Sequence, residues 1–312
     1  MAKSMDGHLN GARNGFAAGA LVQAHIAVFF MGMAGVLAGF SSFTPWQSTF
    51  YRVFLGGVML ACMWPFLGRQ GRLPLKTILL ALFLGALLGF HWFAFFKSID
   101  LLGVTLGSAM IGTEPLVIAL FAFVFLKERL SHKIMIAMAI SSVGFLFLLA
   151  TASSEGGHVF RGVMWSLGSF VIFAVLVIAN RRLVGSHSPM LITALEMLGA
   201  IPVSWLFCRV PLIPNGLHEW LLALGLGVFC TGLAYLLFNT SMKKLPAYYA
   251  GALLSLEVAY GIVAGWILGD KLSAIQLLAA LLIANILVFD IAALLSGSLS
   301  KKRRGRESTS GI

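Results

Sequence analysis

Four ionisable residues lie deep inside apolar stretches of this 312-residue sequence: Arg52, His91, Glu114 and Glu257. An ionisable side chain in hydrocarbon costs about 2.5–3.5 kcal/mol on insertion scales, so each of them requires a functional or structural reason. A buried carboxyl group can hold a cationic group or exchange a coupling proton, and a guanidinium can hold a carboxylate through two parallel hydrogen bonds. The four residues therefore predict a site that binds a small charged solute or a proton.

The two glutamates fall at similar depths in their apolar stretches. Glu114 lies about ten residues into one stretch, roughly 15 Å along a helix, and Glu257 lies at a similar depth in another. A position of this depth corresponds to the middle of a bilayer. A structural role stays open for both glutamates, because either can bond a helix backbone or a polar neighbour. Pro115, for example, frees a backbone carbonyl that a protonated Glu114 can satisfy.

The remaining polar groups in apolar stretches are weaker candidates. Arg52 keeps its charge and needs a partner or water. A structural role is the preferred interpretation and a substrate carboxylate the sharper alternative, and both a pairing with Glu114 and a lipid-facing position remain open. His25, Tyr235 and Tyr260 are interpreted as possible cavity-lining residues, although such side chains more often bond a neighbouring helix.

The composition places the elements that carry these residues in lipid. Apolar residues make up 59% of the chain and charged residues 11%, and the mean hydropathy is +0.95. A soluble chain of this size cannot bury so much apolar surface. The net charge of +11 does not indicate nucleic-acid binding, because the basic residues occupy short gaps and the tail rather than one stripe. The predicted partner is the lipid bilayer.

The chain is predicted to be an all-α integral membrane protein with ten transmembrane helices. A bilayer core of roughly 30 Å needs about 20 apolar residues per helix. Charges, prolines and glycines delimit the predicted spans 17–39, 45–67, 75–96, 102–126, 133–152, 159–180, 189–208, 218–241, 246–268 and 273–295. Residues 1–16 and 297–312 are predicted to form a cytoplasmic N-terminal segment and a basic cytoplasmic tail.

The distribution of Lys and Arg between these spans predicts their orientation. Seventeen basic residues fall on one side and four on the other, with Arg52 inside a span. The expected location is a bacterial inner membrane. Because cytoplasmic loops carry the excess of positive charge, both termini are expected on its cytoplasmic side.

Internal matches divide the ten spans into two halves. The matches are Thr44-Pro45 with Ser188-Pro189 at an offset of 144, Gly112-Thr113-Glu114 with Ser255-Leu256-Glu257 at 143, and Glu128–Ser131 with Asp270–Ser273 at 142. Residues 17–152 and 159–295 are therefore predicted to form two five-helix repeats. Because each repeat has an odd number of spans, the two are inverted relative to each other, and a site is expected near the midplane. Arg52 aligns with Glu196, which is interpreted as structural. Small residues at four-residue spacing, such as Gly85 with Gly89, predict close helix packing.

Three short motifs are similar to those of a known family. Gly89-Phe90-His91-Trp92, Glu114-Pro115 and the Leu-Lys-Glu-Arg-Leu-Ser at 126–131 resemble the EamA branch of the drug/metabolite transporter superfamily, and Leu-Gly-Asp-Lys-Leu-Ser at 268–273 resembles its second repeat ending. The resemblance implies a secondary, ATP-independent transporter of small metabolites such as amino acids or amines, most often an exporter, acting as a monomer or homodimer. It also implies that His91 and Trp92 face a central cavity.

Other classes of function find less support. The sequence has no HExxH, phosphate-binding loop or rhomboid-type serine motif, so no enzyme activity, catalytic residue or cofactor is expected. Cys62, Cys208 and Cys230 lie in apolar stretches without metal-ligand spacing, so no metal site is expected. A membrane receptor or scaffold, and a proton-coupled uptake carrier of the same fold, remain as alternatives.

Overall fold

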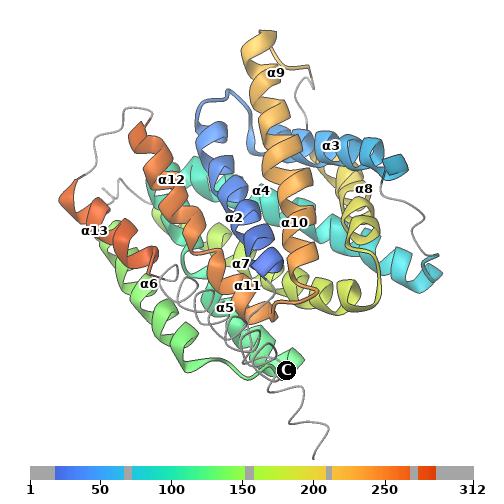
Figure 1. Cartoon of the computed structure of the whole chain (residues 1–312). Coiled ribbons are helices and arrows are strands. Elements are labelled where there is room, and N and C mark those ends of the chain that lie inside the picture. The colour runs from blue at the N-terminus through green and yellow to red at the C-terminus, as the bar shows by residue number, and fades with distance from the viewer. Residues whose placement is uncertain (1–17, 67–71, 152–157, 209–212, 268–272, 286–312) are drawn as a thin grey trace, which may run out of the picture.

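The computed structural model describes residues 18–66, 72–151, 158–208, 213–267 and 273–285, and all regular structure within these ranges is helical (Figure 1). The elements are α2 (Ala18–Gly39), α3 (Pro45–Met63), the 3₁₀ turn η1 (Trp64–Phe66), α4 (Leu75–Ile111), α5 (Glu114–Phe121), the π-helix η2 (Ala122–Leu126), α6 (His132–Thr151), α7 (His158–Ser186), α8 (Pro189–Phe207), α9 (Gly216–Leu224), the π-helix η3 (Gly225–Leu233), α10 (Ala234–Ser241), α11 (Ala247–Leu253), α12 (Leu256–Ile267) and α13 (Ala274–Ile283). The predicted all-helical fold class is confirmed.

Most of the predicted spans correspond to one helix or to a run of helical pieces. Within the described residues, six stretches are long and apolar enough to cross a membrane. Among them are Gly216–Ser241, which contains α9, η3 and α10, and Ala247–Ala264, which contains α11 and part of α12. The run of α5 and η2 and the helix α6 form shorter apolar helices.

The helix α4 differs from the prediction of two separate spans at 75–96 and 102–126. Its helical backbone continues through the expected loop, and the break comes later, at Gly112 and Thr113. His91 and Ile111 nevertheless line one cavity, whereas a straight helix would hold them roughly 30 Å apart. The chain therefore doubles back within α4. The connection between the two spans is short enough to stay helical.

Equivalent residues begin equivalent helices in the two halves. Thr44 caps α3: its side chain accepts a hydrogen bond from the Gln47 N–H at 3.3 Å, and the Gln47 side chain accepts one from the Thr44 N–H at 2.9 Å. Pro45 then occupies the first turn, where its missing N–H costs nothing. Ser188 is likewise the N-cap residue of α8, without a side-chain cap bond, and Pro189 is its first residue, so the offset of 144 relates two helix starts.

The packing of helices follows the same internal symmetry. The helix α3 packs on η3 as α8 packs on α4, and α2 packs on α12 as α7 packs on α5. The equivalent fourth spans of the two halves also pack together, through α5 and α11, and α6 packs on its equivalent α13, with α6 and α13 at one edge of Figure 1. This pattern is expected for two repeats related by a twofold axis.

Two glycines bring α4 and α8 into backbone contact. A Cβ atom added at Gly85 would overlap the carbonyl oxygen of Glu196, and one added at Gly199 would overlap that of Leu82. Gly89 lies one turn further along α4 and faces Ala200. The small-residue spacing at Gly85 and Gly89 was therefore a correct indicator of close helix packing.

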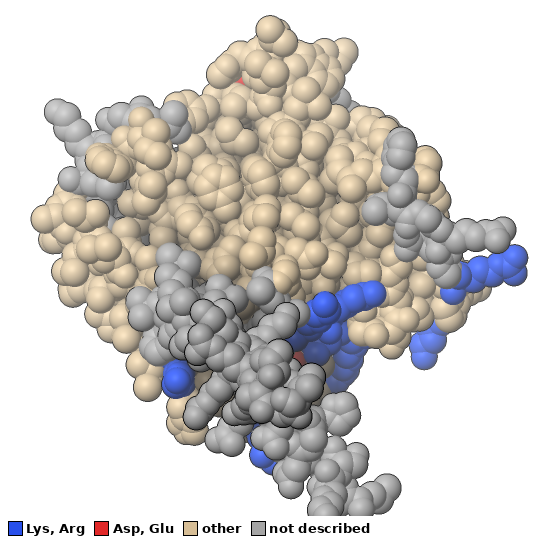
Figure 2. Space-filling model, viewed as in Figure 1, with Lys and Arg blue, Asp and Glu red and all other residues tan. Residues whose placement is uncertain are grey.

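The outer surface is apolar over a broad band, as a membrane protein requires. Phe83, Trp205 and Leu206 expose 60%, 61% and 69% of their surfaces, and Figure 2 shows a wide uncharged area with Lys and Arg gathered at its lower edge. Soluble monomers rarely expose apolar patches beyond a few hundred Å². The chain is an integral, multi-pass membrane protein. We call the edge formed by residues 127–133, residues 181–182 near the end of α7, and residues 243–247 the basic face.

Candidate functional site

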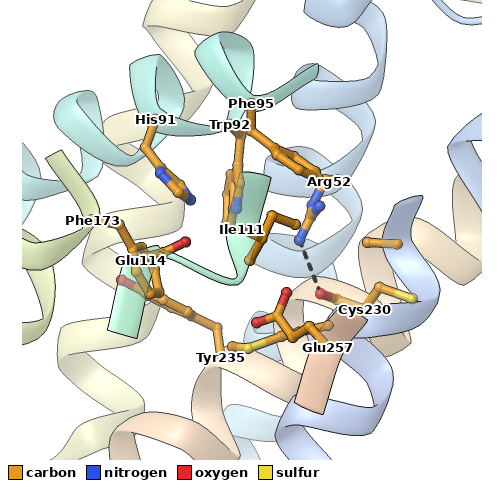
Figure 3. A pocket seen from close by; sticks show the side chains of 12 residues that line it. Arg52, His91, Trp92, Phe95, Ile111, Glu114, Phe173, Cys230, Tyr235 and Glu257 are labelled. Atoms are coloured by element: carbon orange, nitrogen blue, oxygen red, sulfur yellow. Dashed lines mark hydrogen bonds between the residues drawn. The ribbon is translucent and has the colours of Figure 1, made fainter. Parts of the chain in front are cut away.

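A small cavity lies between the two halves, near the middle of the helix bundle (Figure 3). Its volume is about 40 Å³, enough for a few water molecules at roughly 10–15 Å³ each. Its lining comes from α2, α3, α4 and α5 in the first half and from α7, η3, α10 and α12 in the second. The lining residues are Met31, Ala34, Arg52, His91, Trp92, Phe95, Ile111, Glu114, Phe173, Cys230, Tyr235 and Glu257.

Both cavity glutamates follow a break in a helix. Glu114 begins α5 after the break at Thr113, and Glu257 lies in the first turn of α12 after the break at Ser255. At each break a hydroxyl group bonds the carbonyl three residues earlier: Thr113 Oγ1 donates to Met110 at 3.0 Å, and Ser255 Oγ donates to Ala252 at 2.6 Å. These bonds satisfy carbonyls that the interrupted helices leave free. The free N–H groups of a helix start favour a carboxylate or an anionic solute there.

The two carboxyl groups lie in different surroundings. Glu114 is 5% exposed, and its Oε1 atom has no hydrogen-bond partner within the described ranges. Glu257 is partly exposed, and its backbone packs against Gly32 of α2, where an added Cβ would lie 2.8 Å from the Glu257 carbonyl oxygen. In Figure 3, Glu257 faces Arg52 on one side of the cavity and Glu114 faces His91 on the other. Both carboxyl groups are directed into the cavity.

Arg52 is held by hydrogen bonds and aromatic contacts from both halves. Its Nε atom donates to Thr231 Oγ1 at 2.8 Å, and its Nη2 atom donates to the Cys230 carbonyl at 3.1 Å. Its guanidinium carbon lies 4.6 Å from the Trp92 ring centroid and 5.6 Å from that of Phe96. These bonds use two of its five donors, and no ion pair joins it to a carboxylate in the described part of the chain. A charged, positioned donor group therefore faces the cavity.

His91 is fixed by a second polar contact between the halves. Its Nδ1 atom lies 3.0 Å from the Ser169 carbonyl oxygen, and Ser169 Oγ donates to the His91 carbonyl at 3.1 Å. The same Nδ1 atom lies 2.9 Å from Ser169 Oγ. In the tautomer that bonds the Ser169 carbonyl, Nδ1 carries the proton and Nε2 is an acceptor. The ring also stacks on Phe173 with a centroid distance of 4.6 Å. His91 thus contributes an oriented acceptor to the cavity wall.

Aromatic rings form much of the remaining wall. Trp92 and Tyr235 meet edge to face at a centroid distance of 6.0 Å, and Phe95 and Phe173 complete this apolar surface. The Tyr235 hydroxyl accepts a hydrogen bond from Asn180 Nδ2 at 3.1 Å. The cavity therefore combines one cationic group, two carboxyl groups and several ring faces, an arrangement that can bind a solute carrying both charges.

The structure gathers most of the predicted site residues and separates two of them. Arg52, His91, Glu114 and Glu257 line the same cavity, together with Trp92 and Tyr235. Tyr260 instead packs edge to face on Phe29, with a centroid distance of 5.5 Å, and neither it nor His25 is among the lining residues.

Sequence reasoning did not identify several other members of the site. Thr231 and Ser169 hold Arg52 and His91 from the opposite half, and Cys230, interpreted as a packing residue, contributes its carbonyl group. The glycines at 225, 227 and 232 around Cys230 and Thr231 were the available signal, because such residues permit an irregular helix near a site. No group of three or more His, Cys, Asp or Glu side chains that could hold a metal occurs among the described residues.

A helical membrane protein with symmetric halves around a central charged cavity has the architecture of a membrane transporter. Comparison with known families agrees: the EamA-like transporter family matches residues 19–150 and 160–289. The chain belongs to this family, as the motif resemblance predicted, and it is a membrane transporter and not an enzyme.

Individual relatives are transporters as well. The chain is 30% identical over 217 residues to the threonine/homoserine exporter RhtA of Salmonella typhimurium strain SL1344, covering 68% of both chains, and 29% identical to that of Escherichia coli K12 over the same share. It is 25% identical over 260 residues to the uncharacterized transporter YxxF of Bacillus subtilis, covering 78% of this chain and 80% of the relative. A solved crystal structure with 18% identity matches 91% of this chain and 98% of its own, with a TM-score of 0.73, and shows the shared fold.

Proposed function

We propose that this transporter exports a zwitterionic amino acid from the cytoplasm by alternating access around the central cavity. One observation carries the proposal: Arg52 faces the cavity without a carboxylate partner in the described structure, opposite the carboxyl groups of Glu114 and Glu257. An α-amino acid carries the complementary pair of charges on one carbon atom. The names of the Salmonella and Escherichia relatives support this class of solute and the outward direction.

The binding mode follows from the positions of the charged groups. The solute carboxylate pairs with the free donors of Arg52, for which two parallel hydrogen bonds suit its planar group. The solute ammonium is held by Glu257, which faces Arg52, and by Glu114 further along the wall. Trp92 and Tyr235 offer ring faces to the same ammonium group. A solute with only one of the two charges therefore binds less tightly.

The cavity must change during the cycle, because a volume of about 40 Å³ holds water but not an amino acid. The repeat symmetry supplies a route, since two related halves can open alternately toward either side. We propose that the basic face is cytoplasmic, with both termini on that side, because cytoplasmic loops concentrate Lys and Arg.

A cationic amine without a carboxylate is the second candidate solute. It is favoured by the two carboxyl groups, if Arg52 serves only to join α3 to η3. The two candidates differ in the need for a solute carboxylate, so solute analogues separate them.

Counterflow in proteoliposomes tests the proposed function. Vesicles loaded with unlabelled threonine, homoserine, other amino acids or amines are diluted into the labelled solute. We expect transient accumulation for a small neutral amino acid and none for empty vesicles. Accumulation only of amines favours the second candidate, and no counterflow with any solute of the panel favours a receptor.

A further inference from the structure

A second polar cluster lies behind the cavity, entirely within the second half. Glu196 on α8, Asn180 on α7 and Asn239 on α10 are each at most 1% exposed. The Glu196 carboxyl group neighbours both amide side chains. No salt bridge reaches Glu196 among the described residues, and Arg181, next to Asn180, pairs instead with Glu128 at the basic face. The sequence suggested a structural role for Glu196, but the cluster offers it no compensating charge.

Hydrogen-bond accounting shows what the cluster lacks. Asn180 Nδ2 donates to the Tyr235 hydroxyl at 3.1 Å, and Asn239 Nδ2 donates to Thr193 Oγ1 at 3.0 Å. Each amide nitrogen has a second N–H group, and the Glu196 carboxyl group interacts with both amides. No close hydrogen bond, however, reaches the amide oxygens of Asn180 and Asn239 or either oxygen of Glu196. Four buried acceptor atoms thus lack a close donor. Leaving buried polar groups unpaired is costly, and an unpaired buried charge is costlier still.

One proton on Glu196 removes the unpaired charge and supplies a donor to the cluster. A neutral carboxyl group gains one O–H donor, which can bond the amide oxygen of either neighbouring asparagine. We propose that Glu196 binds and releases a proton during the transport cycle, at a site separate from the solute cavity. This inference rests on the proposed transport function and adds the coupling ion to it.

A proton fits the cluster better than a metal ion does. Divalent ions such as Ca²⁺ and Mg²⁺ take six or more oxygen ligands, several of them usually water. The cluster offers four unpaired oxygens within a fully buried region. A proton needs only one donor and one acceptor atom, which Glu196 and either asparagine supply.

Tyr235 links the cluster to the solute cavity. It accepts the hydrogen bond from Asn180 on one side and lines the cavity on the other. It also interacts electrostatically with both Glu196 and Glu114. Among the helices packed on α8, α10 contributes Tyr235 as a titratable neighbour of Glu196. The helix α4 presents Gly85 and Leu82 to α8, and Arg52 of α3 bonds η3 instead. Tyr235 therefore joins the two sites, so that a change in the charge of Glu196 alters the electrostatic environment of the cavity.

Infrared titration of the purified protein in lipid tests proton binding directly. We expect a carboxylic-acid C=O band in wild-type protein that disappears as the pH is raised. The band should be missing from Glu196→Gln and retained by the control Glu219→Gln, which lies at the end of the molecule opposite the basic face. If Glu196→Gln does not fold, Asn239→Leu serves, since the loss of one acceptor must shift the band. A titrating band that is the same in wild type, Glu196→Gln and Asn239→Leu overturns the proposal.

Transport under an imposed pH gradient tests coupling, and counterflow without a gradient separates the two proposals. One pH unit is a tenfold ratio of proton concentration, so one coupled proton drives solute accumulation approaching about tenfold. We expect this accumulation in wild type and in Glu219→Gln and its loss in Glu196→Gln. Equal accumulation in wild type and Glu196→Gln, or accumulation driven by a sodium gradient alone, overturns the inference. Failure of wild-type counterflow would overturn the proposed function, and the infrared result then decides proton binding alone.

Discussion

The carboxylate of Glu128, at the end of the first half's fourth span, accepts a hydrogen bond from the backbone N–H of Ala247 at 3.0 Å. It also accepts one from Tyr248 at 3.1 Å, and Arg181 Nε lies 3.8 Å from its Oε1 atom. Both N–H groups belong to the start of α11, in the other half of the molecule. One side chain therefore caps a helix across the repeat interface, at the basic face.

The Glu128 contact predicts a measurable change when the carboxylate is removed. Glu128→Ala leaves two N–H groups of α11 without their acceptor, so the protein should lose about 0.5–2 kcal/mol of stability, the range for a lost helix cap. The measurement is the thermal unfolding midpoint in detergent, with the exposed Lys133→Ala as a control at the same face. Equal midpoints for the two variants would show that the contact between Glu128 and α11 does not stabilise the protein.

Close packing of α4 on α8 makes Gly85 intolerant of a methyl group. Gly85→Ala places Cβ against the Glu196 carbonyl and must separate the helices, so we expect a loss of about 1–3 kcal/mol, the range for overpacking. Gly168→Ala in α7 is the control, because nothing lies within 4 Å of its added Cβ and alanine favours helix. Thermal unfolding of both variants checks this, and a Gly85→Ala protein as stable as Gly168→Ala would be inconsistent with the packing described.

The support of Arg52 by Thr231 predicts a loss of solute affinity when the threonine hydroxyl group is removed. Thr231→Val keeps the volume of the side chain and removes the hydroxyl group that accepts the hydrogen bond from Arg52 Nε. A hydrogen bond to a charged group contributes about 1.5–3 kcal/mol, which is lost when the guanidinium finds no other partner. We expect solute affinity to fall by about tenfold, measured by thermal shift against solute concentration. Thr240→Val, on the same span with a bond to Leu236 only, should bind normally.

The fold and much of the cavity could be predicted because both depend on residue pattern. Hydropathy delimits spans, and the matched offsets placed Glu114 and Glu257 at equivalent positions, which the structure brings to one cavity. The doubling back between the spans 75–96 and 102–126 was predicted, but the continuous helical backbone of α4 was not, because a short connection that keeps helical geometry leaves no sequence signal. The partners of Arg52 and His91 were also missed, since hydrogen bonds from Cys230, Thr231 and Ser169 depend on the irregular helix η3 and on helix packing.

The pairing of Arg52 with a solute carboxylate is tested most directly by comparing an amino acid with its decarboxylated amine. Dissociation constants for threonine and for 1-amino-2-propanol are measured by calorimetry with wild type and with Arg52→Gln. If Arg52 binds the carboxylate, Arg52→Gln weakens threonine binding by at least about tenfold and leaves the amine nearly unchanged, as expected for the loss of a charged hydrogen-bonded partner. Equal weakening of both ligands, or none, would contradict the assignment of Arg52 to the solute carboxylate.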